Sequence, residues 1–208
     1  MERRNALILP IWTPTSAQLV EEGGVLPDYD AKAVAEVMGL AFVRGPKEGR
    51  GLKGAPASIF ITVDGDTLFI VGRSSHVKGR RVSSPSPILI EKAVESGLPR
   101  ESLQHVAEAI AGGDRVKASA LERGIVPKTT LERRENTLSR QESERTERVA
   151  RIFVHARRAL GSEAEARAFM TTPHPELDGR SPLDAAKTDL GARRAEQILN
   201  ALEFGLAL

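Results

Sequence analysis

A succession of helix start and stop signals, beginning near Ile88, constrains the fold of this 208-residue chain more than any other feature. Ser139-x-x-Glu142 has the pattern of a capping box, in which each side chain bonds to the backbone of the other residue. Ser162-x-x-Glu165 repeats the pattern, and Ser181-Pro182-x-Asp184 places a proline directly after a capping serine. Helices that begin and end at such short intervals must pack on one another, so residues 88–208 are predicted to form a helical bundle.

Glycines and prolines set the expected limits of these helices. Pro99 begins a segment that Gly112-Gly113 ends, and a helix over 116–123 is expected to end at Gly124. A second short helix follows over 127–135. The capping box at Ser139 begins a long helix that ends at Gly161, and Ser162 begins the next one. A further helix is expected to start at Ser181 and to end near Gly191, before a final helix from about Ala192 to Phe204.

Residues 1–84 differ in character from the rest. Short helices are predicted over 15–22 and, with Asp30 as N-cap, over 30–38. Asp64-Gly65 lies between two runs rich in β-branched and aromatic residues, which predicts a β-hairpin over 58–71. Residues 45–54 read as a loop and residues 79–87 as a linker. The fold class is therefore mainly α, with domains at 1–84 (role not assigned by the sequence), 85–138 and 139–208.

Composition excludes several classes of protein. The chain has no cysteine, which rules out disulfides, thiolate zinc sites and cysteine nucleophiles and fits a reducing cytoplasm. No stretch approaches the ~20 apolar residues that span a bilayer. The four histidines lack metal-ligand spacing, and no phosphate-binding loop or nucleophile elbow appears. We therefore expect a cytoplasmic protein that has no membrane segment. We also expect that it is not an enzyme and has no catalytic residue, no metal and no cofactor.

The helices over 116–123 and 127–135 have helix-turn-helix spacing. Residues 92–160 carry 14 basic and 10 acidic side chains, whereas residues 161–208 carry 5 and 8, so the middle of the chain suits a polyanion. Glu132 and Glu135 flank Arg133 and Arg134, however, and a solvated face with ordinary ion pairs explains the pattern equally well. The candidate DNA-binding residues are Lys117, Lys128, Thr129, Thr130, Arg133 and Arg134.

Several motifs follow one another in a fixed order from residue 85 to the end. They are Gly97-Leu98-Pro99, Thr130-Leu131-x-Arg133-Arg134, Leu138-Ser139-x-x-Glu142-Ser143-x-Arg145, Gly161-Ser-Glu-Ala-Glu-Ala166, Pro173-His-Pro-Glu-Leu-Asp-Gly-Arg-Ser-Pro-Leu-Asp184, Thr188-Asp-Leu-Gly-Ala192 and Glu203-Phe-Gly-Leu-Ala-Leu208. Together they resemble the Xre/MbcA/ParS antitoxins that neutralise Res-domain toxins. Val126 departs from that family's pattern, which has a capping serine before the second helix, and Phe169 replaces its frequent tryptophan. Residues 1–84 lie outside the resemblance.

The resemblance implies an antitoxin that blocks the NAD site of a Res-domain toxin encoded by an adjacent gene. Such toxins degrade NAD or use it for ADP-ribosylation. The resemblance also implies that the protein forms a homodimer inside a toxin–antitoxin hetero-oligomer. This complex is expected to repress its own operon by binding operator DNA. An alternative stays open, a stand-alone helix-turn-helix regulator whose C-terminal domain only dimerises.

Prolines stiffen the segment 173–182, and the chain ends in a short apolar tail, so both are expected to contact the toxin. Leu177 and Leu183 have a second interpretation, in which they fill the core. The candidate toxin-binding residues are Pro173, His174, Leu177, Gly179, Arg180, Phe204, Gly205, Leu206 and Leu208.

Overall fold

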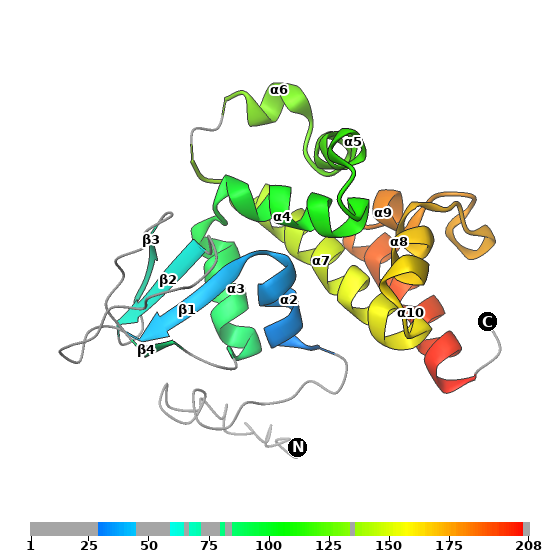
Figure 1. The fold of residues 1–208 in the computed structure, drawn as a ribbon, viewed down its shortest axis with the longest axis horizontal. Helices are drawn as coiled ribbons and strands as arrows, with labels where there is room; N and C mark the ends of the chain where they lie inside the picture. Colours follow the sequence, from blue (N-terminus) through cyan, green and yellow to red (C-terminus); the bar gives the residue numbers. More distant parts are fainter. Residues whose placement is uncertain are drawn as a thin grey trace, which may run out of the picture.

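The computed structural model of the chain describes residues 29–44, 59–64, 67–71, 80–81, 85–133 and 136–205. The described part is mainly helical, as predicted, with one small sheet at an edge of the molecule (Figure 1). The predicted helix over 15–22, the predicted loop over 45–54, Arg134, Leu206 and Leu208 lie outside the described residues.

The sheet has the strand order β3-β2-β1-β4. β2 (Ile59–Asp64) and β3 (Thr67–Val71) pair antiparallel in the segment where a hairpin is predicted, and its turn residues 65–66 lie outside the described residues. β1 (Leu40–Arg44) lies parallel to β2, and β4 (Arg80–Arg81) pairs antiparallel with β1. β1 and β4 were not predicted. Arg80–Arg81 falls in the expected linker. A strand of two residues has no sequence pattern of its own, because it depends on pairing with its neighbour.

The helix α2 (Ala31–Val37) begins where Asp30 predicts it, since the Asp30 carboxylate accepts a hydrogen bond from the Ala33 amide at 2.9 Å. Val34 of this helix and Met38, its C-cap, are fully buried. They belong to one continuous core with residues of the helices that follow. Residues 31–42 and the helices after residue 85 therefore share a core.

The long helix α7 (Arg140–Leu160) is the centre of the helical part. Both bonds of the predicted capping box at Ser139 and Glu142 are present, and Gly161 ends the helix in the left-handed conformation. α3 (Pro87–Ser96) and α4 (Arg100–Ala111) pack on α7, and α4 ends at Gly112 as predicted. These limits confirm that local capping signals govern much of this region.

Two predicted boundaries near the middle of the chain are wrong. α5 (Arg115–Ile125) continues through Gly124, which therefore does not end it. α6 (Lys128–Leu131) is a single turn, much shorter than the predicted helix over 127–135. Its N-cap, Pro127, makes no side-chain cap bond. A helix begun without a capping side chain lacks one source of stabilisation, worth roughly 1 kcal/mol.

The C-terminal elements are α8 (Glu163–Thr171), the 3-10 turn η1 (Pro175–Leu177), α9 (Pro182–Ala185) and α10 (Asp189–Phe204). Ser162 and Ser181 cap α8 and α9 as predicted. The expectation that Gly191 ends a helix is wrong, because α9 is one turn long and Thr188 caps α10 before Gly191. An added Cβ at Gly191 would lie 2.1 Å from the Ala185 carbonyl oxygen, so this glycine allows α9 and α10 to approach closely.

None of the helices in the described ranges combines the length and apolar character that crossing a bilayer requires.

Candidate functional site

Two helices frame the C-terminal part of the molecule. α10 packs along α7, and the last turn of α10 is tied to α7 by polar contacts. The Arg158 guanidinium donates hydrogen bonds to both carboxylate oxygens of Glu203, at 2.8 Å from Nε to Oε1 and 2.9 Å from Nη2 to Oε2. His155 Nε2 lies 3.3 Å from Glu203 Oε2. Two side chains of α7 thereby hold Glu203, the residue that precedes Phe204.

The electrostatics of this contact agree with its geometry. The hydrogen bond from Arg158 is the main reason that the pKa of Glu203 lies below its ordinary value. Burial, aided by the nearby Arg158 charge, lowers the pKa of His155. A carboxylate in the last turn of a helix is unfavourable next to the negative end of the helix dipole. The Arg158 charge offsets that effect here.

The loop of residues 172–181 leaves α8 and returns to α9. Its ends are joined by a backbone hydrogen bond from the His174 amide to the Arg180 carbonyl, at 3.0 Å. The His174 ring also caps η1, since its Nδ1 accepts from the Glu176 amide at 3.2 Å. The His174 ring meets Phe169 of α8 edge to face, with the ring centroids 6.3 Å apart. The loop therefore has a compact internal structure supported by α8.

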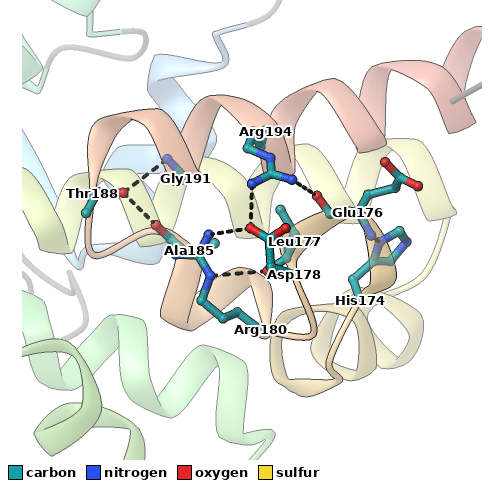
Figure 2. A network of polar contacts seen from close by, with 9 residues as sticks. All are labelled: His174, Glu176, Leu177, Asp178, Arg180, Ala185, Thr188, Gly191 and Arg194. Atoms are coloured by element: carbon teal, nitrogen blue, oxygen red, sulfur yellow. Dashed lines mark hydrogen bonds and ion pairs between the residues drawn. The ribbon is translucent and has the colours of Figure 1, made fainter.

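Figure 2 shows how α10 supports the other side of this loop. Arg194 Nη1 donates to Asp178 Oδ2 at 2.7 Å, and Nη2 donates to the Glu176 carbonyl oxygen at 2.6 Å. Arg180 Nε donates to the Leu177 carbonyl oxygen at 3.1 Å. Two arginines thus hold the backbone of the loop and the side chain of Asp178. Arg180 belongs to the loop, whereas Arg194 reaches it from α10.

The candidate toxin-binding residues of the loop do not all face the solvent. Pro173, Gly179 and Arg180 are exposed, and His174 is half-buried. The side chain of Leu177 is 0% exposed and fills the core beneath the loop, as in its second interpretation. Its physical role is to anchor the loop.

The end of α10 presents an apolar side chain to the solvent. Phe204 is 63% exposed, and Leu202 is also exposed. Gly205 follows with φ +63°, the left-handed conformation in which it ends α10. The exposed ring gives the end of α10 an apolar surface.

The candidate DNA-binding residues lie on a separate part of the molecule. α6 is drawn at the top of Figure 1, well separated from the C-terminal end of α10. Lys128 forms an exposed ion pair with Glu132, with 3.6 Å between Nζ and Oε1, so Glu132 pairs with a lysine where the sequence suggested an arginine. Thr130 is half-buried. The remaining described candidates, Lys117, Thr129 and Arg133, are exposed.

Sequence reasoning missed the residues that hold this site together, namely His155, Arg158, Arg194 and Glu203. Their partners lie 16 to 48 residues away along the chain, and no local pattern marks such pairs. The one available signal is Glu203, whose charge is unfavourable at a helix C-terminus without a cation beside it. Among the described residues, no three His, Asp or Glu side chains are placed to hold a metal ion.

Residues 155–205 match the sequence model of the antitoxin Xre/MbcA/ParS C-terminal toxin-binding domain. The match begins at His155 and ends at Gly205, so it spans the end of α7, α8, the loop, α9 and α10. A search of curated protein sequences finds no match. The similarity of this segment supports an antitoxin function and a toxin partner.

Proposed function

We propose that the protein is an antitoxin that binds and neutralises a protein toxin through residues 155–205. The observation that carries this proposal is the match of that segment to a toxin-binding domain. The geometry supports it, because the segment combines a supported loop with an exposed phenylalanine at the end of α10. A partner that meets prearranged groups loses less conformational freedom on binding.

We further propose that the toxin has a Res domain and that the antitoxin blocks its NAD site. The ordered motifs between Gly97 and Leu208 resemble antitoxins of that class. An exposed aromatic ring and a short apolar tail are suited to entering a pocket, because burying a phenylalanine side chain contributes about 1.5–3 kcal/mol. In this function the chain acts as an inhibitor and not as an enzyme.

The direct experiment is co-expression with the protein encoded by the adjacent gene, followed by co-purification and an assay of NAD loss. The full chain should form a complex and suppress NAD consumption. Deletion of residues 204–208 should restore NAD consumption, since it removes Phe204 and the tail. Val116→Ala is the control, because Val116 is an exposed apolar residue, 81% exposed, that lies on α5 outside residues 155–205.

The results of that experiment test the antitoxin proposal and the Res-domain toxin proposal separately. A complex without any effect on NAD would leave the antitoxin proposal standing and reject the Res-domain toxin. The absence of a complex would reject the antitoxin proposal itself.

Repression of the protein's own operon is a second part of the proposal. The exposed positions of Lys117, Thr129 and Arg133 support it, although α6 has only one turn. Arg133→Ala combined with Arg134→Ala should weaken binding to the operon's promoter DNA and reduce its salt dependence, while toxin binding stays unchanged. If the double variant loses all function and the tail deletion loses none, the alternative of a stand-alone regulator is correct.

A further inference from the structure

Arg194 joins the exposed loop to the helical scaffold. Its guanidinium donates to the Asp178 carboxylate at 2.7 Å and to the Glu176 carbonyl oxygen at 2.6 Å. The side chain starts from the middle of α10, a helix that is packed on α7. Figure 2 shows it reaching from α10 to the turn of the loop. Glu176 and Asp178 of the loop are therefore both tied to one helix.

Asp178 has an unusual backbone conformation. Its φ is +57°, and within the described ranges it is the one residue other than glycine with a positive φ. Such a conformation is unfavourable for an L-residue and persists where neighbouring groups hold it. Arg180 Nη2 also lies 3.4 Å from the same Oδ2 atom that Arg194 binds. Both Arg180 and Arg194 thus contact the side chain of Asp178, the residue with the unfavourable backbone conformation.

The other contacts of the loop do not replace Arg194. Leu177 anchors the loop from below, and the backbone bond between His174 and Arg180 closes its base. The amides of Asp178 and Gly179 donate to the carbonyls of Pro175 and His174, so they bond within the loop itself. Among the described residues, the hydrogen bonds that join this turn to α10 come from Arg194.

We propose that Arg194 is a positioning residue for the toxin partner. It holds residues 176–180 in the binding conformation before the partner arrives, without itself being a contact residue. The inference rests on the proposed function of this segment. An exposed ion pair contributes little to global stability, whereas a loop that is already ordered loses less conformational entropy on binding. The role of Arg194 is therefore expected to appear in the affinity for the partner.

The test is a double-mutant cycle on the full-length chain, with the purified protein encoded by the adjacent gene as the probe. The variants are Arg194→Gln, Asp178→Asn and the two combined. Asparagine tolerates a positive φ, so Asp178→Asn removes the charge and keeps the backbone acceptable. Arg194→Gln should bind roughly tenfold more weakly, and Asp178→Asn should lose less because the bond from Arg194 to the Glu176 carbonyl remains. The double variant should bind no more weakly than Arg194→Gln, because that substitution already removes the contact with Asp178.

Arg140→Gln is the control. Arg140 is also exposed, lies outside residues 155–205 and pairs with Glu144 of its own helix at 3.0 Å. Its substitution should change the dissociation constant by less than about twofold. Unchanged affinity of the Arg194 variant would overturn the inference. Losses that add in the double variant would also overturn it, since they would mean that both side chains touch the partner separately.

Amide hydrogen exchange on the free protein examines the contact without a partner. Arg194→Gln should speed the exchange of the Gly179 and Arg180 amides by roughly tenfold while the amides of α7 keep their rates. Equal exchange in the variant and the wild type would overturn the inference. If the wild-type chain binds no partner, the proposed function fails and this inference with it. If the wild type binds and the Arg194 variant binds equally well, only the inference fails.

Discussion

Gly191 and Gly124 both lie inside helices, yet the same substitution should affect them in opposite directions. A Cβ at Gly191 would lie 2.1 Å from the Ala185 carbonyl oxygen, whereas at Gly124 the nearest such atom is Leu183 Cδ2 at 4.0 Å. Gly191→Ala should destabilise the protein by about 1–3 kcal/mol, because α9 must move. Gly124→Ala should stabilise it by up to about 1 kcal/mol, because alanine favours the helix.

Urea unfolding of the two alanine variants and the wild type measures both effects. A Gly191→Ala variant as stable as the wild type would contradict the close approach of α9 and α10.

His155 should make the stability of the protein depend on pH. Burial lowers its pKa below 6.5, so between 6.5 and the lower folded-state pKa the unfolded chain binds more protons than the folded chain. The contribution of His155 to the free energy of unfolding is therefore fully present above pH 6.5. It falls as the pH decreases through that window, by at most about 1.4 kcal/mol per pH unit. Glu203, whose pKa lies below 4.5, loses its stabilising contribution only at lower pH.

The comparison is urea unfolding of the wild type and His155→Gln at pH 7.5 and 5.5. The wild type should lose more stability than the variant between these two values. Equal losses would show that His155 does not titrate differently in the folded and unfolded chains.

At the scale of the element, the last turn of α10 should depend on Arg158. Arg158→Ala removes the bonds to Glu203 and leaves an unfavourable carboxylate at the helix end. Amide exchange over 201–205 should become faster, while the global free energy of unfolding changes by less than about 1 kcal/mol. Arg157→Ala is the control, because Arg157 pairs with Glu163, 3.6 Å away, and not with α10. Equal exchange in both variants would reject the role of Arg158.

The helices also show which features the sequence can predict. The caps at Asp30, Ser139, Ser162 and Ser181 are local, since donor and acceptor lie within three residues, and the structure confirms them. Gly191 was misread because its small size serves a contact between two helices and not a helix end. A glycine looks the same in a sequence for either purpose.

At the scale of the whole molecule, Tyr29 ties the chain before the sheet to the centre of the helical part. Its hydroxyl donates to Glu147 Oε1 of α7 at 3.0 Å, and burial raises the pKa of both groups. Tyr29→Phe should destabilise the protein by about 1 kcal/mol, because a part-buried carboxylate loses one hydrogen-bond donor.

A double-mutant cycle with Glu147→Gln tests this contact by urea unfolding. The loss caused by Tyr29→Phe should be smaller in the Glu147→Gln background. The same loss in both backgrounds would show that the two side chains are not coupled.

Long-range pairing limits how much of the molecule a sequence can predict. The parallel pairing of β1 with β2, the burial of Val34 in the shared core and the contact of Arg194 with Asp178 all join distant segments. Each depends on the folded arrangement of several elements and leaves no local pattern. The C-terminal loop and the exposed Phe204 were predicted as features, whereas the side chains that hold them were not.

The central claim is that residues 155–205 form the toxin-binding surface. Its most direct test is a hydrogen-exchange comparison of the free chain with its complex with the protein encoded by the adjacent gene. Protection should concentrate in the loop of residues 172–181 and in the residues that follow Leu199. Protection confined to α5 and α6, or to the sheet, would contradict the claim.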